Sequence, residues 1–310
     1  MLSRERGVAI ITALLLTTLA VTIVASLFWQ QQVQVRSIEN QRLQLQKQWI
    51  LRGALDWTRL ILREDARYSN VDYLGEPWAV SLAETRLDQY VENGRAETDV
   101  PDAAISGSIV DAQSRYNLTN LCQNGKINDA EVAAFARLLN QAQLNPSLAQ
   151  ATAELMASAQ ASATVNGGAG TGGSPQPLNI VYVDDLLAVP GFTAEALAKV
   201  RDFLVVLPRV TPVNVNTAPA EVLAARIEGL TLSEAAALVA SRERTYFSST
   251  NDFAQRLPGK NLPSSGAQID VRTSFFLVNG NVRLNRAAME MQTLIQRDGV
   301  NTRIVWIRES

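Results

Sequence analysis

The sequence predicts an α+β protein in which a long N-terminal helix packs on a small antiparallel sheet and a large all-α domain is inserted between the strands. An uncharged apolar run near the N-terminus continues into a segment without proline, which indicates one long helix. Alternating apolar residues at 104–110, and again beyond residue 275, indicate strands. Short helical patterns separated by prolines lie between these two regions and indicate an inserted helical domain.

The first element is a membrane-spanning helix. Residues 1–7 form a charged leader, and the run from Val8 to Trp29 contains no charged side chain. At about 1.5 Å per residue, a helix of this length spans the roughly 30 Å hydrocarbon core of a bilayer. Its threonine hydroxyls can bond to a carbonyl one turn earlier, which makes them tolerable in lipid. We therefore predict a transmembrane helix at 8–29.

The leader sets the orientation of this helix and leaves three interpretations of it open. Arg4 and Arg6 precede the apolar run and no basic residue follows it closely, which places the leader in the cytoplasm and the remainder outside. The run could be a secretory signal cleaved near Ala25, an uncleaved anchor, or a prepilin segment that is cut after Gly7 and retained. Gly7 at the edge of the run, and a helix that continues past the membrane, favour the third interpretation.

The continuation of the helix, called the spine below, is visible between residues 30 and 67. This stretch has no proline, and its single glycine is Gly53. Apolar residues recur at helical spacing, which predicts one face docked on a globular head. The predicted face consists of Leu43, Ile50, Ala54, Trp57 and Ile61.

The strands are predicted in two separate regions. Residues 104–110 form one strand, and the C-terminal segment forms three, with hairpin turns expected at Gly280-Asn281 and Asp298-Gly299. A sheet built from the first region alone is too small to be stable, so the C-terminal strands should complete it. The predicted divisions are a leader at 1–7, a membrane helix at 8–29, the spine and first half of the sheet at 30–121, an inserted all-α domain at 122–265, and completing strands at 266–310.

Within the insertion, the sequence predicts helix boundaries and a linker. Asp129 should cap a first helix, and Asn145-Pro146 should separate it from a second. Residues 164–177 are rich in glycine and predict a flexible linker. Gly168, Gly170 and Gly173 within it satisfy a nucleotide-binding pattern, but no strand precedes them and no helix follows, so we interpret them as low complexity.

Composition restricts the chemistry. Twenty-eight basic and thirty acidic residues give a formal charge of -2, so no global field attracts nucleic acid. The sequence contains no histidine, which excludes histidine-dependent triads and histidine-ligated zinc. The single cysteine, Cys122, lies in an apolar context and is interpreted as a buried small residue. We expect no enzyme activity, no catalytic residue and no nucleic-acid partner.

A family resemblance rests on the N-terminus and on four further stretches. Mature type IV pilins usually carry glutamate as their fifth residue, whereas the fifth residue from Val8 is Thr12. The other stretches are LGEPWAV at 74–80, SIVDAQSRYNLTNL at 108–121, VDDLLAVPGFTAE at 183–195 and PVNVNTAPAEVLAA at 212–225. In their order and spacing they resemble the K-type minor pseudopilins of type II secretion systems, over most of the chain except about 149–179. These proteins share the type IV pilin-like fold.

The resemblance implies a function and a location. Such a subunit caps the pseudopilus tip and nucleates assembly for export of folded proteins across the outer membrane. A tip subunit has no neighbour above it that would require the fifth-residue carboxylate, which accounts for Thr12. The chain is expected to span the bacterial inner membrane once, with its C-terminal bulk in the periplasm.

The same resemblance implies processing and partners. Prepilin peptidase should cleave between Gly7 and Val8, followed by N-methylation of Val8. Minor pseudopilins of the I and J types, and then the H type, should pack against the membrane helix. Small residues suit that contact. The expected contact residues are Thr12, Ala13, Ala20 and Ala25.

A DNA-binding alternative comes from residues 212–260, which resemble helix-hairpin-helix modules of membrane-anchored competence receptors. Arg242, Arg244 and Lys260 supply some positive charge, but Glu228 occupies the place that a phosphate would approach. The favoured interpretation is structural: Asn216 or Thr217 caps a helix that packs on a second one.

Metal is also implied only by the resemblance, since K-type relatives bind calcium through an acidic loop. The corresponding region here, 151–179, contains Glu154 as its only carboxylate, whereas calcium prefers six to eight oxygen ligands. Asp184 and Asp185 are explained by a helix N-terminus. We expect no metal site and no cofactor.

Overall fold

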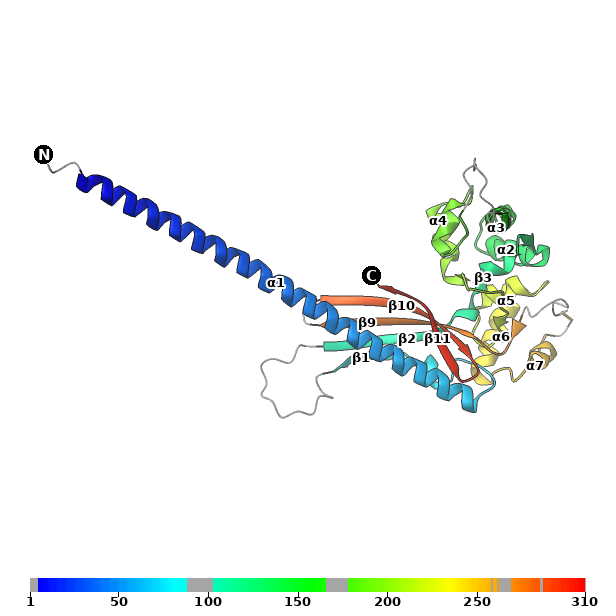
Figure 1. Cartoon of the computed structure of the whole chain (residues 1–310). Helices are drawn as coiled ribbons and strands as arrows, with labels where there is room; N and C mark the ends of the chain where they lie inside the picture. The colour runs from blue at the N-terminus through cyan, green and yellow to red at the C-terminus, as the bar shows by residue number, and fades with distance from the viewer. Residues whose placement is uncertain are drawn as a thin grey trace.

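The computed structural model describes residues 5–87, 103–165, 178–257, 259–260, 262, 269–284 and 287–309. A long helix, α1 (Glu5–Tyr68), precedes a five-stranded sheet and a group of short helices (Figure 1). These helices are α2 (Asp129–Gln141), α3 (Ser147–Val165), α4 (Ala194–Val200), α5 (Ala220–Arg226), α6 (Leu232–Arg244) and α7 (Thr250–Gln255). The sheet contains β1 (Leu82–Arg86), β2 (Ala103–Asp111), β9 (Phe275–Leu284), β10 (Ala287–Asp298) and β11 (Asn301–Glu309).

Shorter elements connect these parts. The 3₁₀ helices are η1 (Pro77–Ala79), η3 (Ala112–Ser114), η4 (Leu118–Leu121), η5 (Val183–Ala188) and η6 (Arg201–Phe203). Three pairs of two-residue strands are β3 (Tyr116–Asn117) with β6 (Leu204–Val205), β4 (Cys122–Gln123) with β5 (Lys126–Ile127), and β7 (Val213–Asn214) with β8 (Ile269–Asp270). Two of these pairs, β3–β6 and β7–β8, are parallel.

The sheet is assembled from two distant parts of the chain. Its order is β1-β2-β9-β10-β11, and all neighbours are antiparallel. β2 ends at Asp111 and its neighbour β9 begins at Phe275, so the chain leaves the sheet between them and returns. This confirms the prediction that the C-terminal strands complete the sheet. Helices α2 to α7 all lie in the intervening segment, and the finer domain bounds stay a prediction.

The spine lies across one face of the sheet. Leu51, Leu55 and Leu62 are buried there and belong to one hydrophobic cluster with Trp78 and Phe276. The Trp78 and Phe276 rings meet edge to face at 5.2 Å between centroids. The buried positions of the helix, three or four residues apart, are Lys47, Leu51, Leu55, Thr58 and Leu62.

The face predicted from sequence overlaps the docked side of the helix only in part. Trp57 is 68% exposed, so its assignment to the docked face is wrong. The other predicted members flank the stripe and are partly buried: Leu43, Ile50, Ala54 and Ile61. A shift of one residue turns a helical stripe by about 100°. Both stripes are apolar in sequence, and only contact with the sheet distinguishes them.

Gly280-Asn281 is not a turn, contrary to the prediction. β9 continues through both residues, and Gly280 pairs with Gly107 on β2. A side-chain carbon at Gly280 would lie 3.5 Å from Leu51 Cδ2. This is an ordinary contact distance, so the strand continues here because its ladders with β2 and β10 run through both residues.

The second predicted turn, at Asp298-Gly299, is confirmed. β10 ends at Asp298 and β11 begins at Asn301, which leaves a two-residue loop. Gly299 has a φ of +54°, a conformation that glycine adopts at low cost. Further along β11, a register shift leaves Val305 without a partner on β10. Such a bulge increases the twist of an edge strand and discourages pairing with other chains.

The inserted domain packs on the opposite face of the sheet from the spine. Successive strand residues point to opposite faces, so Phe275 and Leu277 face away from α1. They form a cluster with Leu294 of β10 and with Val205 and Leu207 of the insertion. The insertion is therefore joined to the sheet by a continuous apolar contact.

Two helix boundaries of the insertion test the predictions made for it. The cap of α2 is Asn128, whose side chain accepts a hydrogen bond from the Glu131 amide, so the assignment to Asp129 is wrong by one residue. Asn145-Pro146 separates α2 from α3 as predicted. Helix α3 continues to Val165, beyond the predicted start of the linker, and residues 166–177 lie outside the described part of the chain.

Candidate functional site: the exposed faces of the long helix and the inserted domain

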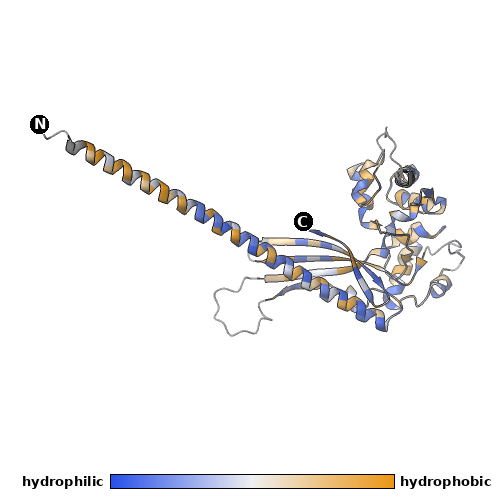
Figure 2. Cartoon of the chain, in the orientation of Figure 1, coloured by the Kyte–Doolittle hydropathy of each residue, from blue (hydrophilic) through white to orange (hydrophobic). Residues whose placement is uncertain are grey.

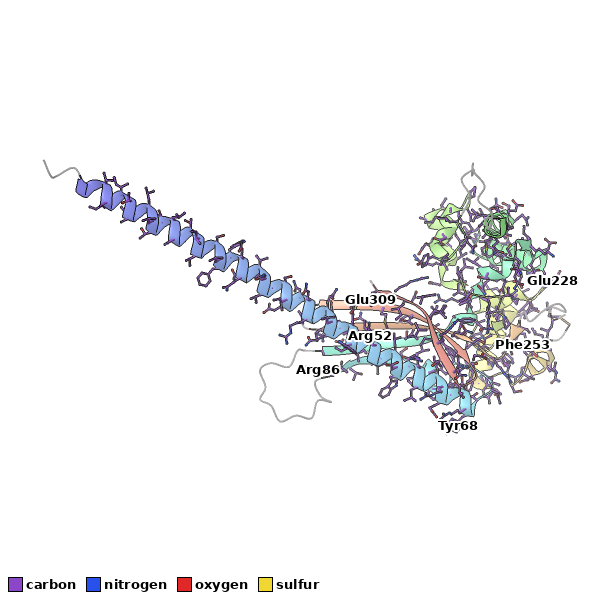
Figure 3. The ribbon with its side chains drawn as sticks, in the orientation of Figure 1. Arg52, Tyr68, Arg86, Glu228, Phe253 and Glu309 are labelled. Atoms are coloured by element: carbon purple, nitrogen blue, oxygen red, sulfur yellow. The ribbon has the colours of Figure 1, made fainter. Side chains whose placement is uncertain are left out.

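Residues 8–29 of α1 carry no charged side chain and are exposed on all sides in the part of the chain that the structure describes. Figure 2 shows a continuous apolar stretch there, and Figure 3 shows its side chains projecting into open space. Among the described residues, α1 is the one helix long and apolar enough to cross a membrane. The hydroxyls of Thr12, Thr17, Thr18 and Thr22 donate to carbonyls three or four residues earlier, as predicted.

The predicted contact residues do not share one face of this helix. Ala13 and Ala20 are seven residues apart and lie on one side, whereas Thr12 and Ala25 are turned from them by roughly 80° to 140°. The structure shows instead a shallow apolar groove lined by Ala9, Ile10, Ala13, Leu14 and Thr17. Ala9 and Thr17 were not among the predicted contact residues, although their spacing of four residues around Ala13 suits close helix packing; the contact residues stay a prediction.

The spine carries a second apolar face, opposite its contact with the sheet. Trp49 and Trp57 are each 68% exposed, and Leu45 and Leu60 are also exposed. Between the tryptophans lies Gly53, whose missing side chain would meet no atom of this chain within 4 Å. Glycine in an exposed helix costs about 1 kcal/mol relative to alanine, and no contact within the described chain accounts for it.

The segment proposed to resemble a helix-hairpin-helix module does contain two packed helices, α5 and α6. Asn216 and Thr217 do not cap the first of them, because that position is Pro219. Asn216 exchanges hydrogen bonds with the backbone of Phe247 at 2.8 and 3.0 Å, and Thr217 donates to Asp111 at 2.6 Å. These polar side chains fix the fold of the insertion, so the capping prediction is wrong.

Two of the three basic residues considered for DNA binding in this module are engaged within the protein. Arg242 is buried and donates to the carbonyl of Val215 at 2.7 Å, and burial lowers its pKa to about 10. Lys260 donates to the carbonyl of Gly229 and pairs with Glu234 at 3.3 Å. Because a carbonyl and a carboxylate of the hairpin already bind its lysine, little positive charge remains there for binding a phosphate. The DNA-binding alternative is not favoured.

A buried ion pair lies in the core of the inserted domain. Arg226 Nη1 is 2.7 Å from both carboxylate oxygens of Glu131, and both side chains are almost fully buried. The Tyr116 hydroxyl donates to the Glu131 carbonyl and carboxylate, and Arg226 lies over the Tyr116 ring. Burial, followed by the Glu131 charge, raises the Tyr116 pKa well above its ordinary value. Sequence patterns gave no signal for this pair.

A second charged group lies where α1 ends. Carboxylate oxygens of Asp65, Asp72 and Glu76 are all within 4.8 Å of one another. Arg297 of β10 donates to Asp65 at 2.7 Å and also to Asp72, and Glu76 accepts from Trp78 Nε1 at 2.8 Å. Burial raises the pKa of Asp65 and of Glu76. These bonds form an ion-pair network that joins the end of the spine to the sheet.

The residues considered for calcium lie apart from that network. Glu154 is on the exposed side of α3, and the following segment, 166–177, is outside the described residues. Asp185 accepts hydrogen bonds from two backbone amides at the start of η5, which agrees with its interpretation as a helix N-terminus. Asp184 pairs with Arg201 at 2.5 Å. The Cys122 thiol donates a hydrogen bond to Gln160 Oε1, and burial raises the pKa of this thiol.

These features define a class of protein: a pilin-like subunit with a membrane-length apolar helix, a helix-on-sheet head and an inserted helical domain. Two family models, both described as type II secretion system protein K, match residues 114–209 and 213–272, together half of the chain. The chain belongs to the protein K family of type II secretion systems, and it is a minor pseudopilin.

Individual relatives agree over nearly the whole chain. Type II secretion system protein K of Pseudomonas aeruginosa is 28% identical, over 94% of this chain and 89% of the relative. The Klebsiella pneumoniae protein K is 26% identical, over 96% and 94% respectively. A chain of the GspK–GspI–GspJ complex from enterotoxigenic Escherichia coli has the same fold, with a TM-score of 0.64 and 17% identity over 89% of this chain and 99% of that one.

Proposed function

We propose that this minor pseudopilin caps the tip of the pseudopilus and nucleates its assembly for export of folded proteins across the outer membrane. The observation that carries the proposal is the position of the inserted domain. It lies at the end of the molecule that is remote from the N-terminus, beside the last turns of α1 (Figure 1). A bulky domain there would occupy the space that the next subunit of a filament needs. Thr12, in place of the usual glutamate, agrees with a subunit that has no neighbour above it.

We infer that the chain is a single-pass protein of the bacterial inner membrane, with its C-terminal bulk in the periplasm. The uncharged run at 8–29 supports the span, and Arg4 and Arg6 in front of it support a cytoplasmic leader. The protein would act through assembly rather than catalysis and without a cofactor. The absence of histidine and the buried state of Cys122 support that view.

The proposed leader makes a prediction about processing. Prepilin peptidase is expected to cut between Gly7 and Val8 and to leave an N-methylated Val8. Intact mass and N-terminal sequencing of the protein from its native membrane should therefore show a chain that begins at Val8. Replacing Gly7 with leucine should leave the full-length chain, whereas Gly53→Leu should be processed normally. A start near Ser26, or an intact Met1 in the wild type, contradicts the proposal.

We propose that the partners are minor pseudopilins of the I and J types, followed by the H type. The related Escherichia coli protein was solved as a GspK–GspI–GspJ complex. Two faces of α1 suit such partners: the groove at Ala9, Ala13 and Thr17, and the outer face of the spine. Gly53 between two exposed tryptophans would let a partner helix approach closely.

The partner proposal is tested by co-purifying the full-length chain with its cognate I- and J-type subunits from membranes. The wild type should form the complex, and Trp57→Ala should weaken it by about 2 kcal/mol, roughly 30-fold, because exposed tryptophans are frequent hot spots. Tyr68→Ala is the matched control, since Tyr68 is an exposed aromatic residue at the end of the same helix. No complex with the wild type would contradict the proposed function; equal effects of the two variants would contradict the role of Trp57.

A further inference from the structure

The buried carboxyl group of Asp111 lies where the sheet meets the inserted domain. Asp111 is the last residue of β2 and is 1% exposed. Its carboxylate accepts hydrogen bonds from the Gln113 amide at 2.7 Å, from Asn214 Nδ2 at 2.8 Å and from Thr217 Oγ1 at 2.6 Å. Asn214 and Thr217 both belong to the insertion. One side chain of the sheet thus holds two side chains of the inserted domain.

The same junction also includes the segment that follows the spine. Asn214 Nδ2 donates to the Asp72 carbonyl as well as to Asp111, at 3.0 Å. The Asp72 amide donates to the Val271 carbonyl at 2.9 Å, and the Asp72 carboxylate accepts from the Thr273 amide at 2.7 Å. Tyr73 stacks on Tyr246 of the insertion at 4.1 Å between ring centroids. Spine, sheet and insertion therefore meet around Asp72 and Asp111.

The charged groups around Asp111 do not compensate its charge. Arg297 is the cation of this region, and it pairs with Asp65 and Asp72 instead. Asp111 is held by neutral donors only, and burying a carboxylate in this way carries a free-energy cost. The charged groups that face the junction are Asp65, Asp72 and Glu76 from the segment around the end of α1, Asp111 from β2 and Arg297 from β10. The stacked Tyr73 and Tyr246 are its further titratable groups.

The free-energy cost of burying the Asp111 carboxylate increases with pH. Burial, with the nearby Asp72 charge acting in the same direction, raises the pKa of Asp111 to about 6 against hydrogen bonds that lower it. A group with a raised folded-state pKa contributes stability at low pH and loses that contribution as the pH rises through the raised value. For Asp111 the window therefore lies between its ordinary pKa of 3.8 and about 6.

We propose that Asp111 is a positioning residue whose charge sets how firmly the inserted domain is held on the sheet. When the carboxyl group is neutral, the junction is closed more of the time; when it is charged, the junction opens more often. The Thr217 hydroxyl can reverse its hydrogen bond and accept from a protonated Asp111, so the contact survives protonation. The inference goes beyond the proposed function and requires no partner subunit.

Hydrogen exchange of the full-length protein in detergent tests this inference. Protection factors, corrected for the intrinsic pH dependence of exchange, are measured at pH 5 and pH 7 for the junction amides of Asp72 and Thr273. The pKa of Asp111 is 3.8 when the junction is open and about 6 when it is closed. This difference predicts protection factors about tenfold higher at pH 5 than at pH 7. The amide of Val282, in the middle of the sheet, should show no such difference.

Two variants make the test specific. Asp111→Asn should remove most of the pH dependence, and the remainder belongs to Asp65 and Glu76, whose raised pKa values act in the same direction. Asp252→Asn is the control and should keep the wild-type dependence, because that carboxylate bonds within and beside α7.

If Asp111→Asn does not fold, Thr217→Val replaces it. Thr217 donates a hydrogen bond that lowers the Asp111 pKa, so its loss should move the midpoint of the pH dependence to higher pH. Equal protection of the wild type at pH 5 and pH 7 would overturn the inference. So would a full tenfold difference in Asp111→Asn, or an unchanged midpoint in Thr217→Val.

Discussion

Glu131→Ala is expected to lower the free energy of unfolding of the inserted domain by about 3–5 kcal/mol. The substitution removes the partner of Arg226, which is 2% exposed and has two further nitrogens, Nε and Nη2, without a hydrogen-bond partner among the described residues. It leaves a guanidinium charge in the core beside the Tyr116 ring. A buried charge without a counterion is among the largest single destabilising changes known in proteins.

The measurement is urea denaturation of the full-length protein, followed by far-ultraviolet circular dichroism. A matched control replaces both charges, Glu131→Leu with Arg226→Met. Apolar groups of similar size often replace a buried ion pair without loss of stability, so the double variant should be close to the wild type. A Glu131→Ala protein within about 1 kcal/mol of the wild type would show that the pair is solvated, contrary to its burial.

Arg297→Ala is expected to cost a similar amount at neutral pH, about 3–5 kcal/mol. Arg297 pairs with Asp65 and Asp72 and lies over the Phe276 ring at 4.6 Å, so its loss removes a cation from a buried acidic group. Without the cation, the pKa of Asp65, which burial already raises, should rise further. The loss of stability should therefore be largest at neutral pH and become smaller as the pH falls and Asp65 takes up a proton.

Thermal or urea unfolding at pH 7 and pH 5, followed by tryptophan fluorescence, measures this effect. Arg303→Ala is the matched control, since Arg303 is an exposed arginine on the neighbouring strand that bonds to Gln296. Its effect should stay within about 0.5 kcal/mol. An Arg297→Ala protein that is equally destabilised at both pH values would contradict the electrostatic account.

Sequence periodicity predicted the main elements because they are long and strongly patterned. The helix to Tyr68, the strand at 104–110 and the completing C-terminal strands all follow from local pattern. The errors have a common physical origin in contacts between distant segments. Gly280 reads as a turn residue, but it lies inside a strand because it pairs with Gly107 of β2, which is distant in the sequence. Trp57 fits an apolar stripe, but the sheet covers the neighbouring stripe.

The sequence alone is enough to propose a site where a function depends on a linear segment. The leader, the apolar run and Thr12 are read directly from the order of residues. By contrast, Thr217 and Asp111 are 106 positions apart in the sequence, and only the closed fold shows that they meet. A polar residue before a helix suggests a cap. When a buried partner distant in sequence binds that side chain instead, the local sequence does not reveal it.

The uninterrupted course of α1 has a mechanical consequence. With residues 8–29 in the bilayer, as proposed, packing on the sheet starts near Leu43, about 20 Å above the membrane surface. Among its described residues the helix contains no proline and no break that could act as a joint. Pulling the anchor upward by one helical turn would raise the sheet and the inserted domain by the same distance, about 5.4 Å, and turning it would rotate them through the same angle. The helix is thus a stiff rod that transmits both displacement and torque.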